Sequence, residues 1–168
     1  GEGVGVNEIT VIKFQLDDGR YLVPATFRPE TIFGATNVWL NPEVHYIEVE
    51  VKDGISKGDK WIMSNDAFTN ISNQHELEII GDVDAKAIIG QNVKNPLTGA
   101  PLPVFPASFV DAEYGTGVVF SEPADAPADY MALQDLKNNA ELLEEYGIAD
   151  IAAKTEPIPT ITVKGYSE

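Results

Sequence analysis

Short apolar runs, each ended by turn-forming residues, fill the first two thirds of this chain of 168 residues. Runs rich in β-branched and aromatic residues are typical of strands, and Gly, Pro, Asn and Asp between them are typical of turns. The 14 glycines and 11 prolines supply those interruptions. A chain divided in this way has little room for long helices there, so it predicts a sheet of many short strands.

Residues 8–16 lead through Asp17-Asp18-Gly19, a hairpin signal, into a second strand-like run at 20–23. Further strands are predicted at 36–40, 45–51, 59–63, 76–81, 102–105, 117–120 and 158–163. Helices are predicted from Ser64 or Asn65 to Ile71, over 84–89, from Asp125 to Asn139 and from Ala140 to Tyr146. This pattern indicates an α+β fold in one domain, 1–168, with a closed or strongly curved, β-barrel-like sheet and a few helices outside it.

The composition excludes several classes of function. The chain carries 27 acidic and 11 basic residues, a net charge of −16, whereas a free-standing nucleic-acid binder has a basic face. It has no cysteine, which excludes disulfides, thiol catalysis and thiolate zinc sites. Its two histidines lack metal-ligand spacing, so no metal is expected. No run approaches the roughly 18 apolar residues of a membrane span, and the start lacks a signal-peptide pattern. We expect a cytoplasmic protein.

The segment Thr26-Phe27-Arg28-Pro29-Glu30-Thr31 follows a predicted strand directly. Because Pro29 disfavours a helical conformation at Arg28, the strand is predicted to break here in a fixed loop between two threonine hydroxyls. The alternative is a strand end followed by a helix with Pro29 near its first position. The residues alone leave both possibilities open.

A second unusual segment is Gly115-Thr116-Gly117, which leads into a predicted strand, a loop and then a helix. The two glycines would let the backbone approach a ligand closely. The segment is not a phosphate-binding loop, because no Gly-Lys-Ser/Thr follows.

Asp129 lies four residues before Leu133, on the apolar face of the predicted helix. An inward carboxylate is costly unless donors or cations meet it, so Asp129 is predicted to lie at the rim of a cavity. The alternative is a salt bridge to Arg28 or a lysine. Asp125 has the simpler interpretation of a helix N-cap.

Together, the two segments resemble the two signatures of the editing domain inserted in leucyl-tRNA synthetases. The first signature continues beyond Thr31 through Gly34, Thr36 and Asn41-Pro42, and the second comprises Gly115-Thr116-Gly117-Val118-Val119, Pro123, Asp129 and Tyr130. The continuation Asn37-Val38-Trp39 resembles the archaeal and eukaryotic cytosolic type.

This resemblance implies a β-barrel-like mixed sheet and hydrolysis, by a positioned water, of the ester in tRNA(Leu) mischarged with norvaline, isoleucine or a similar amino acid. Asp129 would hold the α-ammonium group, and Thr26 and Arg28 would lie near the ester and the terminal adenosine, so these three residues form the implied catalytic set. Thr31 would exclude a leucine side chain. The other substrate-binding residues implied are Phe27, Thr116, Tyr130 and Asp125.

The partners implied are the aminoacylated 3′ end of tRNA(Leu) and the remainder of the parent synthetase. No cofactor is expected in this domain, since ATP is used elsewhere in the parent.

Three residues depart from the family's pattern. Phe27 stands where many bacterial relatives have threonine, Asp125 where histidine is usual, and Glu122 where an apolar residue is usual. The two added carboxylates are expected to raise the pKa of Asp129 by like-charge repulsion. The alternative function is an editing-inactive domain retained for aminoacyl-tRNA binding or for the architecture of the parent.

Overall fold

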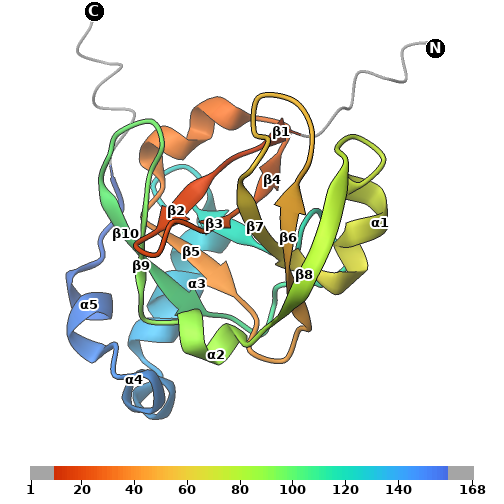
Figure 1. Ribbon diagram of the computed structural model, residues 1–168. Coiled ribbons are helices and arrows are strands. Elements are labelled where there is room, and N and C mark those ends of the chain that lie inside the picture. Colours follow the sequence, from red (N-terminus) through yellow and green to blue (C-terminus); the bar gives the residue numbers. More distant parts are fainter. Residues whose placement is uncertain (1–9, 159–168) are drawn as a thin grey trace, which may run out of the picture.

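The computed structural model describes residues 10–158 and is built on a nine-stranded mixed sheet, in the order β11-β5-β10-β9-β2-β3-β7-β6-β8 (Figure 1). Two short strands, β1 and β4, form a separate antiparallel pair. The strands are β1 (Thr10–Val11), β2 (Phe14–Leu16), β3 (Tyr21–Leu22), β4 (Ala25–Thr26), β5 (Asn37–Leu40), β6 (Tyr46–Val51), β7 (Lys60–Ser64), β8 (Leu77–Val83), β9 (Asn92–Lys94), β10 (Pro101–Pro106) and β11 (Val119–Ser121).

The helices are short, apart from one in the last third of the described chain. They are η2 (Pro29–Gly34) and η3 (Asn65–Ala67), which are 3₁₀ helices, and α1 (Phe68–Ile71), α2 (Ala85–Ile88), α3 (Pro127–Lys137), α4 (Ala140–Tyr146) and α5 (Ala149–Lys154). Residues of α3 and α5 pack with the β5–β10 region on one face of the sheet.

The α+β class with a mixed sheet is confirmed, and the sheet is open rather than closed into a barrel. Strands β11 and β8 are its two edges, and they pair only with β5 and β6 respectively within residues 10–158. Closure requires the first and last strands to share a hydrogen-bond ladder. The three residues of β11 form their ladder with β5 instead.

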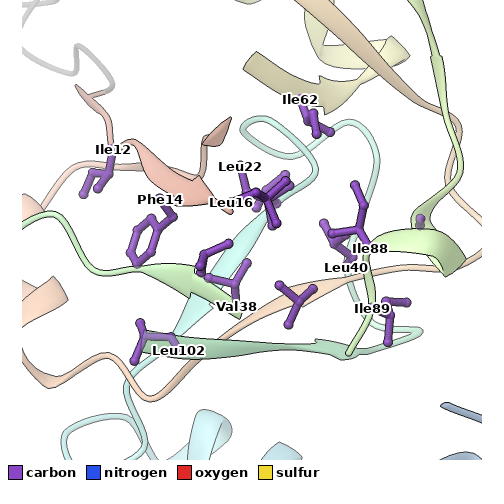
Figure 2. Packing of buried hydrophobic residues seen from close by; sticks show 14 of the residues in the cluster. Ile12, Phe14, Leu16, Leu22, Val38, Leu40, Ile62, Ile88, Ile89 and Leu102 are labelled. Carbon is purple, nitrogen blue, oxygen red and sulfur yellow. The ribbon is translucent and has the colours of Figure 1, made fainter. Parts of the chain in front are cut away.

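Strand β5 is buried on both faces, and it connects the two sides of the structure. Because side chains alternate along a strand, Val38 and Leu40 enter the main core (Figure 2), whereas Trp39 lies in a second cluster with Leu133 and Leu136 of α3. The strand pairs in parallel with β10 and antiparallel with β11. It therefore fixes β11, and the loop that follows it, against α3.

Helix α3 begins at Pro127 rather than at Asp125, so the N-cap prediction for Asp125 is wrong. The N-cap is Ala126, which has extended backbone angles and no side-chain cap. Pro127 explains the shift, because proline favours the first helical position and keeps the preceding residue extended. Ser64, in contrast, does cap the next helix by accepting a hydrogen bond from the Ala67 N–H.

Several elements are not predicted by the sequence. Strand β9 has one buried residue, Val93, between two exposed ones, and its place depends on pairing with β10 and β2. Strand β4 is too short, at two residues, to form a recognisable pattern. Helix α5 has no side-chain cap that would mark its start in the sequence. The strand predicted at 158–163 falls almost entirely outside the described residues.

Gly117 allows the loop before β11 to approach the end of β7. A Cβ atom added to this glycine would lie 2.6 Å from the Cβ of Ser64, and its φ is +78°. The Gly117 carbonyl also accepts a 2.7 Å hydrogen bond from the buried Tyr46 hydroxyl. The close approach expected at this glycine is therefore made to Ser64.

The substitution Gly117→Ala is expected to lower the free energy of unfolding by about 2–5 kcal/mol, since left-handed strain and overpacking add. Gly99→Ala is the matched control, because Gly99 has the same φ of +78° but no atom within 4 Å of the position that a Cβ would take. The control is expected to cost about 1–2 kcal/mol. Equal losses for the two variants in urea unfolding would contradict the packing argument.

Candidate functional site

A pocket of about 180 Å³ brings together the two sequence segments. Thr26 and Thr31 line it from the first segment, Glu122 and Asp129 line it from the second, and Tyr114 lines it from the position directly before the second segment. The rest of its wall is formed by Gly115 and apolar side chains, namely those of Ala25, Val118, Val119 and Phe120. Three hydroxyl-bearing residues and two carboxylates thus share a small and otherwise largely apolar space.

The two threonine hydroxyls are fixed by the backbone of Arg28. The Arg28 N–H donates to Thr26 Oγ1 at 3.0 Å, and Thr31 Oγ1 donates to the Arg28 carbonyl at 2.8 Å. Pro29 is the first residue of η2, so the alternative of a strand end followed by a proline-started helix describes this segment. One residue therefore sets the rotamers of both hydroxyls.

Asp129 projects from the first turn of α3 and is half-buried at the pocket. Its Oδ2 accepts a 2.8 Å hydrogen bond from the Glu122 N–H, in the loop between β11 and α3. This bond ties the loop to the helix. Within residues 10–158 Asp129 forms no ion pair with Arg28 or a lysine, so the salt-bridge alternative is wrong.

Burial is the main cause of the altered acidity of this site. It raises the pKa of Asp129, and the hydrogen bond from the Glu122 N–H partly opposes that shift. The direction agrees with the sequence prediction, but the cause is desolvation rather than repulsion. Like-charge repulsion affects Glu122 instead, whose pKa is raised first by burial and then by the charge of Asp125.

A larger groove of about 660 Å³ adjoins the pocket and shares Thr31 and Glu122 with it. Its lining includes Arg28 and Asp125. The Arg28 side chain is 74% exposed, and its Nε lies 3.5 Å from Glu30. The guanidinium group thus belongs to the groove, while the backbone of the same residue supports the pocket.

The remaining sequence-predicted residues do not line the pocket. Phe27 and Tyr130 are 58% and 44% exposed, and Thr116 is buried. The Thr116 hydroxyl has no hydrogen-bond partner in the described part of the chain, although its carbonyl accepts from the Ser64 N–H. Sequence reasoning assigned no role to Tyr114, whose only signal was its position directly before Gly115.

Within residues 10–158, no three His, Cys, Asp or Glu side chains are grouped to hold a metal ion. None of the helices described is long and apolar enough to cross a membrane.

The family follows from a comparison of the sequence with known families. The sequence model of the family described as "Leucyl-tRNA synthetase, editing domain" matches residues 3–147, a range that contains both segments of the pocket. The chain belongs to this editing-domain family.

Archaeal leucine–tRNA ligases are similar over the whole chain. The enzyme of Methanothermobacter thermautotrophicus is 54% identical over 169 residues, which cover 100% of this chain and 17% of that protein. The enzyme of Methanopyrus kandleri is 46% identical over 171 residues, covering 100% of the chain and 18% of that protein. The chain thus spans less than a fifth of the length of these relatives.

Solved editing domains share the fold. The crystal structure of GlLeuRS-CP1 has a TM-score of 0.78 and 29% identity, covering 90% of this chain and 70% of that one. The editing domain of the P. knowlesi cytosolic leucyl-tRNA synthetase has a TM-score of 0.76 and 18% identity, covering 89% of this chain and 69% of that one.

The substitution Asp129→Asn is expected to stabilise the fold at neutral pH. Because the pKa of Asp129 is raised in the folded chain, the folded state binds the proton more tightly than the unfolded state, and ionisation costs stability as pH rises. Asparagine removes that cost and retains an oxygen for the Glu122 N–H. The gain should shrink as pH falls and vanish below the ordinary pKa of 3.8.

Urea unfolding across this pH range measures the effect, with Asp135→Asn, an exposed position on the same helix, as the control. A gain that does not depend on pH would contradict the assignment to Asp129 ionisation.

Proposed function

We propose that this chain is the editing domain of a longer cytoplasmic leucyl-tRNA synthetase and hydrolyses the ester of mischarged tRNA(Leu). The observation that carries the proposal is the pocket that joins Thr26, Thr31 and Asp129, supported by membership of the editing-domain family. In the reaction, a water oxygen attacks the ester carbonyl carbon and the bond to the ribose oxygen breaks. The free amino acid leaves, and the ribose oxygen takes up a proton.

Asp129 is proposed to bind the α-ammonium group of the attached amino acid. Its Oδ2 is occupied by the Glu122 N–H, which leaves Oδ1 for the ligand. Burial raises the pKa of this carboxyl group, so the charged form is poorly solvated and gains more from a cation than an exposed carboxylate would.

The two hydroxyls have different capacities, and this assigns them different roles. The Thr31 hydroxyl donates its hydrogen bond to the Arg28 carbonyl, so it can act only as an acceptor toward a ligand. Thr26 Oγ1 accepts from the Arg28 N–H and keeps its proton. We therefore assign Thr26 as the donor to the attacking water or to the oxygen that becomes negative during the attack.

Arg28 supports this reaction through its backbone, and its exposed side chain lies on the groove side, where we place the terminal nucleotide. The groove lining includes Asp125, which we likewise place toward the nucleotide rather than the amino acid. Phe27 and Tyr130, which are exposed, are proposed as outer residues of the site, and the buried Thr116 is proposed to support the loop that precedes β11.

The substitution Asp129→Ala in the full-length parent is expected to reduce deacylation of isoleucyl-tRNA(Leu) by about 100-fold or more. The loss follows because the bound ammonium would lose its charged hydrogen-bond partner and the Glu122 N–H would lose its acceptor. The measurement is release of labelled isoleucine under single-turnover conditions. Asp135→Ala is the control for a charge removed from the same helix, and unchanged deacylation by Asp129→Ala would refute the role of Asp129.

Thr31 is proposed to exclude leucine by its methyl group, since its hydroxyl is held by Arg28. Thr31→Ser retains the hydrogen bond and removes the methyl group, so it is expected to hydrolyse leucyl-tRNA(Leu) about 10-fold faster than the wild type, in line with one methylene's worth of discrimination. Thr31→Val retains the side-chain shape and should still protect leucyl-tRNA(Leu). Protection by the serine variant, or its loss in the valine variant, would contradict the steric role.

Measurements on the wild-type full-length parent distinguish active editing from the editing-inactive alternative. If the full-length parent binds a non-hydrolysable aminoacyl-adenosine but leaves isoleucyl-tRNA(Leu) intact, the domain serves for binding or architecture only.

A further inference from the structure

Glu122 lies at the boundary between the pocket and the groove and lines both. Its side chain is partly buried, and within residues 10–158 its carboxylate has no hydrogen bond or ion pair. Its charge interacts with Asp129 on the pocket side and with Arg28, Glu30 and Asp125 on the groove side. A partly desolvated carboxylate without a hydrogen bond is costly in a folded chain, so a ligand group that donates a hydrogen bond to it would be stabilised there.

The number of hydrogen bonds available to an ammonium group points to the same residue. An ammonium group has three donors. Asp129 offers Oδ1, because its Oδ2 accepts from the Glu122 N–H, and Thr31 Oγ1 offers a lone pair. Thr26 Oγ1 accepts from the Arg28 N–H, and its proton is assigned to the attacking water or to the ester oxygen, so it belongs to the ester side of the site. The remaining donor of the ammonium is assigned to Glu122, which beside Asp129 is the other carboxylate that lines the pocket.

The backbone also keeps the two carboxylates together. The hydrogen bond that fixes Asp129 comes from the N–H of Glu122 itself, so the position of one carboxylate is tied to the residue that carries the other. Glu122 itself lies in the turn between β11 and α3, in which its carbonyl accepts from the N–H groups of Asp125 and Ala126.

Resting on the proposed function, we propose that Glu122 is a second anchor for the α-ammonium group of the aminoacyl end, acting beside Asp129 and adding to the selectivity of the pocket for a free amine. The site thereby discriminates between an α-amino acyl end and the same acyl group whose α-nitrogen is missing or capped.

The test compares two ligands that differ in one group. The first is 3′-amino-3′-deoxyadenosine that carries norvaline in amide linkage, and the second carries 2-hydroxypentanoate, which replaces the ammonium by a hydroxyl. Calorimetry measures the affinity of this chain for each. Glu122→Gln is expected to weaken binding of the amino ligand by about 10-fold or more, since a charged hydrogen bond is lost. Binding of the hydroxy ligand is expected to change less than about twofold, because its neutral hydroxyl forms no hydrogen bond between two charged groups with Glu122.

Glu113→Gln is the matched control, because it makes the same substitution at an exposed residue, directly before Tyr114, that lines neither the pocket nor the groove. Glu122→Ala serves as a second variant, and thermal unfolding of each variant shows that it is folded. Equal weakening by Glu113→Gln, equal weakening for both ligands, or tighter binding by Glu122→Gln would each overturn the proposal.

The outcome is distinguishable from failure of the proposed function. If Asp129→Ala abolishes deacylation in the parent while Glu122→Gln leaves amino-ligand affinity unchanged, the role of Glu122 alone is refuted. If the wild-type chain binds neither ligand and the parent does not deacylate, both proposals are refuted.

Discussion

The double burial of β5 is the constraint on which the arrangement of the site depends. A strand with apolar groups on both faces stabilises two cores at once, and here Val38 and Leu40 serve one core while Trp39 serves the other. Since β5 also pairs with β10 on one side and β11 on the other, the sheet and the α3 layer are fixed relative to each other. The turn that carries Glu122 follows directly from β11.

Backbone groups rather than side-chain networks position the hydroxyls and the carboxylate of the pocket. The Arg28 peptide groups hold both threonine hydroxyls, and the Glu122 N–H holds Asp129. Backbone donors and acceptors keep their geometry when neighbouring side chains move, so the pocket is organised before a ligand arrives. Preorganised hydrogen-bonding groups of this kind stabilise developing charge in many enzymes, and the proposed function would use them in that way.

Much of the fold could be predicted because its signals are local. The strand regions and the helix at Ala140–Tyr146 follow from short patterns of apolar residues and turn formers. Strand β9 could not be predicted, because Val93 is its one buried residue and pairing with distant strands gives it its conformation. Closure of the sheet depends on which strands meet at its edges, and no local pattern contains that information.

The site was predictable where a residue contradicts its surroundings. Asp129 on an apolar helix face indicated a cavity, and the structure places it at one. Thr116 and Tyr130 belong to the same motif but do not line the pocket. The orientation of Thr116 depends on the turn at Gly117, and that of Tyr130 depends on the start of α3 at Pro127, so neither could be predicted from the motif. The cause of the Asp129 pKa shift was missed for a similar reason, since burial depends on packing between segments that are distant in the sequence.

The parallel pairing of β5 with β10 has a consequence for the order of folding. It joins Val38 to Val104, so it closes a long loop, whereas β6 and β7 pair as near neighbours in the chain. Bringing distant segments together costs chain entropy before their contacts stabilise the fold. The folding rate therefore falls as the share of such long-range contacts rises. Thr26 and Thr31 lie far before Asp129 in the sequence, and a further long-range pairing, that of β11 with β5, precedes the loop that completes the pocket. The pocket is therefore expected to be among the last parts of the domain to assemble, after the hairpins that surround it.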